Sequence, residues 1–123
     1  MSSNDFAFVH LDKNPARIFP LSWDEVKNEE LNGKLPWNDF RNWLLFQGGR
    51  GNDSVVVVDY GENGSIYYQL SEECIFLDNH AALIEVLKAY RFLLTIYENA
   101  YVFSFEGGTY ENEKSLTDWV DAI

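Results

Sequence analysis

The pattern of hydrophobic and polar positions along the chain predicts four short strands. They are Phe6–Leu11, Ser54–Tyr60, Ser65–Leu70 and Tyr101–Phe105. Side chains alternate across a strand, so Ile66 and Tyr68 share one face of the third strand while Tyr67 lies on the other. The run Val55–Val58 is apolar on both faces, which predicts a central strand covered on both sides.

Helical spacing of apolar residues predicts four helices. Ser22 with Glu25 is typical of a capping box, which predicts a helix from Ser22 to about Leu31. The others are Pro36–Gln47, His80–Glu98 with Asn79 as its cap, and Ser115–Ala122 capped by Ser115 or Thr117.

The predicted order is β-α-α-β-β-α-β-α over 123 residues. A chain of this length favours one domain, here residues 1–123. The order indicates the α+β class, with a small, mainly antiparallel sheet packed against helices. The segments 48–53 and 106–113 are expected to be loops, the second of them acidic.

Charge is divided unevenly along the chain, whose net charge is −11. Residues 1–50 hold seven acidic and six basic side chains, whereas residues 51–123 hold thirteen and three. Nucleic acid is an unfavourable partner for such a chain, because its binding requires cationic side chains. A cationic macromolecule is the partner that this charge distribution favours.

No targeting or membrane segment is evident. The N-terminus lacks a basic region followed by an apolar core, so it does not resemble a signal peptide. The most apolar stretch, 81–100, contains four charged residues and is too polar to span a bilayer. The single Cys74 fits a reducing compartment, and we expect a cytoplasmic protein without membrane contact.

Candidate chemistry is sparse. Cys74, Asp78 and His80 lie close in sequence, but a catalytic triad needs convergence in space, so we expect Cys74 to be a buried apolar residue. His10 and His80 are expected to be surface or satisfied polar residues, not catalysts, with His10 in a strand and His80 in a helical first turn. Phosphate-binding, dinucleotide and metal motifs are absent, so we expect no catalytic residue, cofactor or metal. A small enzyme that uses Cys74 or the Glu72–Glu73 pair is the weakest alternative.

The stretch "VVVVDYGENGSIYYQLSEE", residues 55–73, combines acids and tyrosines without any Lys or Arg. Tyrosine is favoured at interfaces because it offers contact area and a polar tip at low entropic cost. We therefore predict a partner-binding surface; the alternative is that Tyr60 and Tyr68 belong to the core and the acids only confer solubility. The predicted surface residues are Asp53, Asp59, Tyr60, Glu62, Tyr67, Glu72, Glu73, Asp78, Glu106, Glu111 and Glu113.

Four stretches carry a resemblance to a known family. They are "LSWDEVKNEEL" (21–31), "GKLPWNDFRNWLLFQGG" (33–49), "VVVVDYGENGSIYYQL" (55–70) and "EKSLTDWVDAI" (113–123). Together they resemble the SUKH superfamily, the domains related to a yeast cell-wall regulator. The resemblance implies a bacterial immunity protein that binds and neutralises a cognate toxin domain, often a nuclease, in polymorphic-toxin or contact-dependent growth inhibition systems.

The main alternative is a DNA mimic that inhibits a DNA-binding protein. Mimicry needs carboxylates spaced like phosphates along an elongated surface, and core elements interrupt the acids of this chain. Binding to several unrelated DNA-binding proteins would favour mimicry, whereas preference for one partner would favour immunity.

Overall fold

A computed structural model describes residues 5–11, 20, 22–26, 35–71 and 74–122. The elements of the described chain follow in sequence order. They are β1 (Phe6–His10), α1 (Trp23–Glu25), α2 (Trp37–Phe46), β2 (Arg50–Gly51), β3 (Val55–Asp59), the 3-10 turn η2 (Gly61–Asn63), β4 (Gly64–Leu70), β5 (Cys74–Ala81), α3 (Leu83–Ile96), β6 (Ala100–Ser104), β7 (Thr109–Glu111) and α4 (Glu113–Asp121).

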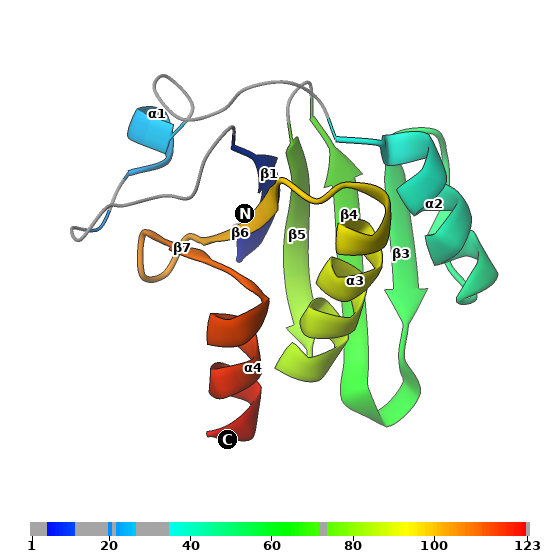
Figure 1. Cartoon of the computed structure of the whole chain (residues 1–123). Helices are drawn as coiled ribbons and strands as arrows, with labels where there is room; N and C mark the ends of the chain where they lie inside the picture. The colour runs from blue at the N-terminus through cyan, green and yellow to red at the C-terminus, as the bar shows by residue number, and fades with distance from the viewer. Residues whose placement is uncertain (1–4, 12–19, 21, 27–34, 72–73, 123) are drawn as a thin grey trace.

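The strands of the described residues form one antiparallel sheet in the order β2-β3-β4-β5-β1-β6-β7 (Figure 1). The first strand, β1, lies inside the sheet, because it pairs with β5 on one side and with β6 on the other. The predicted α+β class and the antiparallel sheet are confirmed.

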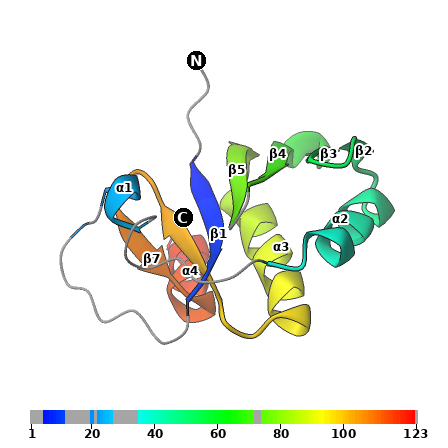
Figure 2. The ribbon, with the colours of Figure 1, turned by 90° about the horizontal axis from the view of Figure 1, so that it is seen from above.

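The main core lies between the sheet and the helices α2, α3 and α4. Phe40 of α2 is fully buried, and its ring meets the rings of Phe8 and Tyr68 with centroids 5.7 Å and 5.6 Å apart. Both contacts are edge-on, a geometry worth roughly 0.5–1.5 kcal/mol beyond the area buried. Figure 2 shows α2 and α3 together on one side of β3, β4 and β5.

A second, smaller core lies on the opposite face of the sheet, under α1. The ring of Trp23 lies 5.3 Å from that of Phe76, 5.7 Å from Phe103 and 5.1 Å from Phe105. Ser22 and Glu25 form the predicted capping box, and residues 27–31 of the predicted helix lie outside the described residues. The half of this face near β1, β6 and β7 is therefore covered by α1.

Three strands were not predicted from the sequence. The expected loops contain β2 and β7, and the segment before the long helix forms β5. Asn79 is part of β5 instead of a helix cap, and α3 begins at Leu83 after Ala82. The physical reason is tertiary: β5 pairs with β1 over Cys74–Leu77 and with β4 up to Ala81, and the ladder with β4 outweighs the local helical pattern at positions 79–81.

The bounds of the other helices and strands differ less from the predicted bounds. The predicted helix 36–47 appears as α2, and the predicted hairpin appears as β3 and β4. The terminal helix starts two residues early, because Asn112 provides the cap and Ser115 closes a reciprocal capping box. None of the described helices has the length and apolar character that crossing a bilayer requires.

Candidate protein-binding surface

One half of the second sheet face, over β3, β4 and β5, has no described element packed on it (Figure 2). Cross-strand register defines its composition, since paired residues of an antiparallel ladder point to the same side. Val57, Tyr67 and Asp78 form one row across the three strands, and Asp59, Ser65 and His80 form the next. We call this surface the open sheet face, made of Val55, Val57, Asp59, Ser65, Tyr67, Gln69, Asp78 and His80.

The valine run explains why this face is unusual. Val56 and Val58 are fully buried against the helices, whereas Val55 and Val57 are only partly buried on the open sheet face. The prediction that this strand is central and covered on both sides is wrong, because only the two-residue β2 lies beyond it and only one of its faces carries described elements. The sequence thus provides apolar residues for a second contact that the described chain does not make.

Tyr67 is the exposed aromatic residue of the open sheet face. Its side chain is 45% exposed, and its register neighbours are Val57 on β3 and Asp78 on β5. Along β4 it is flanked by Ser65 and Gln69, as alternation requires. Among the described residues no ring packs against Tyr67, and nearly half of its surface is accessible to another molecule.

Asp78 and His80 lie on the same face of β5. The Nε2 atom of His80 is 3.1 Å from Oδ1 of Asp78, and the imidazole is more exposed than the carboxylate. The expectation that His80 belongs to a helical first turn is wrong, because β5 continues to Ala81. This pair sets a polar border beside Tyr67.

The tip of the hairpin adds two predicted acids. Asp59 ends β3, and its Oδ1 accepts a hydrogen bond of 2.9 Å from the backbone N–H of Gly61. Glu62 is exposed in η2, the turn that follows. Both carboxylates therefore lie at the same end of the open sheet face.

Tyr60 is also in this hairpin, but its side chain points into the core. Its hydroxyl lies 2.7 Å from that of Tyr68, which is fully buried. Burial raises the pKa of Tyr60, and burial followed by the proximity of Tyr60 raises the pKa of Tyr68 well above its usual value. Both phenols therefore stay protonated at neutral pH, and Tyr60 offers little contact area to a partner.

A buried carboxylate fixes the hairpin tip against α3. Glu85, in the first turn of α3, accepts a hydrogen bond of 3.0 Å from the side-chain amide of Asn63 in η2. Its Oε1 atom also lies 3.6 Å from Nζ of Lys88. The hydrogen bond between Asn63 and Glu85 therefore joins this end of the open sheet face to α3.

The other predicted surface residues lie elsewhere. Asp53 is fully exposed just before β3, 3.9 Å from Nη2 of Arg41. Glu106 is exposed in the turn after β6, while Glu111 is only 8% exposed and accepts a hydrogen bond from Thr109. Glu113 pairs with Arg91 at 3.2 Å on the helix side.

Glu72 and Glu73 are outside the described residues. Of the predicted set, the structure brings together Asp59, Glu62, Tyr67 and Asp78.

Sequence reasoning did not place Val55, Val57 and His80 on this sheet face. The valines were assigned to a covered strand, and His80 to a helix. The run Val55–Val58 was the available signal, because a continuous apolar run is also typical of a strand whose second face is covered by another chain. Two further exposed aromatic residues, Phe46 at 87% and Trp119 at 39%, lie on α2 and α4, away from this face.

The described residues assemble neither a metal-binding cluster nor the Cys-His-Asp group. No group of three metal-ligating side chains occurs there. Cys74 is buried as predicted, and His80 follows six positions later on the same strand, about 20 Å away at the usual rise per residue. The Cys-His-Asp grouping seen in the sequence is therefore not assembled in space.

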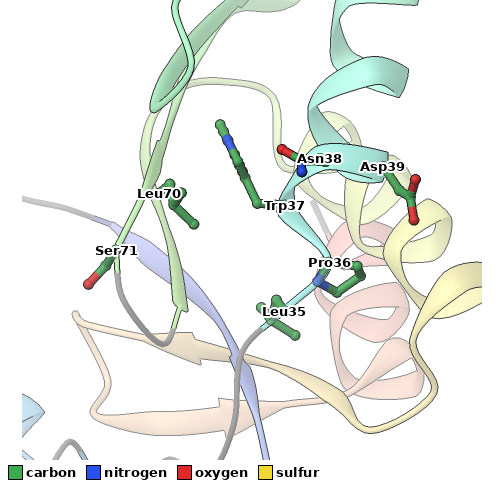
Figure 3. A pocket seen from close by; sticks show the side chains of 7 residues that line it. All are labelled: Leu35, Pro36, Trp37, Asn38, Asp39, Leu70 and Ser71. Carbon is green, nitrogen blue, oxygen red and sulfur yellow. The ribbon is translucent and has the colours of Figure 1, made fainter.

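The β4 end and the start of α2 enclose a hollow of about 580 Å³ (Figure 3). Trp37 contributes one wall, and its Nε1 donates a hydrogen bond of 2.6 Å to the carbonyl of Asp53. Asp39 is the single titratable side chain of the described lining, so the hollow lacks the paired groups that acid–base chemistry needs. Its lining residues are Leu35, Pro36, Trp37, Asn38, Asp39, Leu70 and Ser71.

Comparisons of the chain with protein-family models, with curated proteins and with solved structures found no match.

Proposed function

We propose that this protein is an immunity-type inhibitor that binds one cationic toxin domain through the open sheet face. The expected target is a nuclease, whose active site is cationic because it holds phosphate. In this proposal the chain acts in the bacterial cytoplasm and contributes contacts without catalysing a reaction. The resemblance to the SUKH superfamily, within polymorphic-toxin systems, points to the same role.

The observation that carries the proposal is the combination of side chains on one uncovered face. Partly exposed valines and Tyr67 supply apolar contact area, and tyrosine is one of the residue types that dominate the affinity of protein interfaces. Asp59 and Asp78 supply charge of the sign that a cationic partner requires. The net charge of −11 accelerates the encounter with such a partner at low ionic strength.

The direct test uses a toxic, basic C-terminal domain of a secreted protein encoded immediately upstream. We expect the activity of this toxin domain to fall linearly as the inhibitor is added and to reach zero at one equivalent. The Tyr67→Ala variant should weaken inhibition. Trp119→Ala is the matched control and should leave inhibition unchanged, because Trp119 is similarly exposed but lies on α4, away from the open sheet face.

Two results would contradict the proposal. One is full toxin activity in excess wild-type protein. The other is equally tight binding to several unrelated DNA-binding proteins, which would favour the DNA-mimic alternative.

A further inference from the structure

We propose that Tyr67 is the docking position for an arginine side chain of the partner, with Asp78 and Asp59 as its counter-charges. This inference deepens the proposed function and rests on it for the identity of the partner. It commits the open sheet face to one chemical class of contact, a guanidinium laid on an aromatic ring.

The availability of the ring is the first step. Most rings of the described chain contact one another, as Trp43 and Phe92 do with stacked centroids 4.4 Å apart. Tyr67 has no such contact among the described residues, and Ser65 and Gln69 beside it on β4 provide no aromatic surface. A free ring face carries a negative quadrupole that attracts cations.

The charges around the ring are the second step. Asp78 is the register partner of Tyr67 on β5, so its carboxylate begins about 5 Å away at Cβ. Asp59 on β3 is a diagonal neighbour of Tyr67, because its register partner Ser65 lies two positions before Tyr67 on β4. A cation on Tyr67 is thus within reach of two carboxylates on opposite strands.

The basic side chains already near this site are the third step. On the described strands of this face they are Arg50, which pairs with Val57 one strand further out, and His80, whose Nε2 contacts Asp78. Asp59 makes a backbone hydrogen bond and no ion pair with a described residue. Asp59 therefore offers an unpaired carboxylate to an external cation, and Asp78 offers a second one that it shares with His80.

Arginine fits this arrangement better than lysine. Its planar guanidinium stacks on an aromatic ring while its N–H groups still reach carboxylates on either side. Lysine offers a compact charge that can satisfy the ring or one carboxylate at a time.

The test uses a hexa-arginine peptide and its uncharged counterpart, hexa-citrulline, with NMR detection of the Tyr67 ring and the Trp119 indole. We expect saturable shifts at Tyr67 with hexa-arginine only. Tyr67→Phe should preserve the affinity, and Tyr67→Leu should lower it about tenfold, because leucine keeps apolar area but removes the ring. Asp78→Asn should also weaken binding.

Equal affinity of the Leu and Phe variants, or larger shifts at Trp119 than at Tyr67, would overturn this inference. Its failure is separable from that of the proposed function. Inhibition of the toxin without a Tyr67 response to arginine removes only the docking position. A Tyr67 response without toxin inhibition removes only the immunity role.

Discussion

At the scale of single residues, two glycines shape the hairpin that carries the candidate surface. Gly61 and Gly64 both have positive φ angles, of 67° and 94°. A Cβ on Gly61 would meet no atom within 4 Å, whereas a Cβ on Gly64 would lie 2.1 Å from the carbonyl oxygen of His80. Gly64 therefore allows β4 to approach β5 at the point where the open sheet face begins.

This difference gives a stability prediction. Gly61→Ala should cost about 1 kcal/mol, the usual cost of the left-handed region for a residue with a side chain. Gly64→Ala should cost about 3 kcal/mol or more, because strain and backbone overlap act together. Urea denaturation of both variants measures this, and equal costs would show that β4 and β5 separate easily there.

Tyr90 gives a pH prediction. Its hydroxyl donates a hydrogen bond of 2.6 Å to the carbonyl of Ala100, and burial raises its pKa well above the value near 10 of an exposed tyrosine. Between the unfolded and folded pKa values only the unfolded chain loses the proton. The contribution of Tyr90 to stability is therefore constant below about pH 10 and is lost as pH rises beyond it.

The Tyr90→Phe variant tests this explanation. It should be about 1 kcal/mol less stable at pH 8, because the hydrogen bond is lost. Its further loss between pH 9 and 11 should be smaller than that of the wild type. Denaturation midpoints across that range decide the matter, and parallel curves for the two proteins would contradict the role of Tyr90.

At the scale of elements, the hydrophobic pattern of the sequence predicted those helices and strands that interactions within one segment determine. The helix α2 and the hairpin β3–β4 were predicted because their apolar spacing and turn residues are complete within each segment. The strands β5 and β7 were missed, because they are defined by pairing with β1, β4 and β6. Of the candidate surface, Tyr67 and Asp78 were predicted, but the exposure of the valines depends on the sheet order, which the sequence does not show.

The terminal helix α4 gives a prediction at this scale. Leu116 is its single fully buried residue among those described, and it belongs to the main core. Leu116→Ala should lower stability by about 3 kcal/mol through lost burial and a cavity. The binding affinity of the folded variant should remain that of the wild type, because α4 lies away from the open sheet face. Loss of binding at a temperature where the variant is folded would assign α4 to the interface.

At the scale of the whole molecule, the acids do not form one continuous surface among the described residues. Asp59 and Asp78 border Tyr67, whereas Glu106 and Asp121 lie near β7 and α4. Charges separated by more than about 10 Å are largely screened at 0.1 M salt. We therefore expect the acids near Tyr67 to control association with the partner, and the distant acids to contribute mainly to solubility.

Two double variants with the same change in net charge test this expectation. Asp59→Asn with Asp78→Asn should slow association with the toxin domain by about tenfold at about 0.1 M salt, where distant charges are screened. Glu106→Gln with Asp121→Asn should slow it by less than about twofold. Stopped-flow rates at several salt concentrations measure both, and a larger effect of the second pair would place the partner near β7 and α4.

Hydroxyl-radical footprinting of the inhibitor–toxin complex tests the central claim most directly, because it reports the exposure of Tyr67, Phe46 and Trp119 in one experiment. Binding should strongly reduce oxidation of Tyr67 and leave that of Phe46 and Trp119 unchanged. Protection of Trp119 or Phe46 with Tyr67 still fully reactive would show that the partner does not occupy the open sheet face.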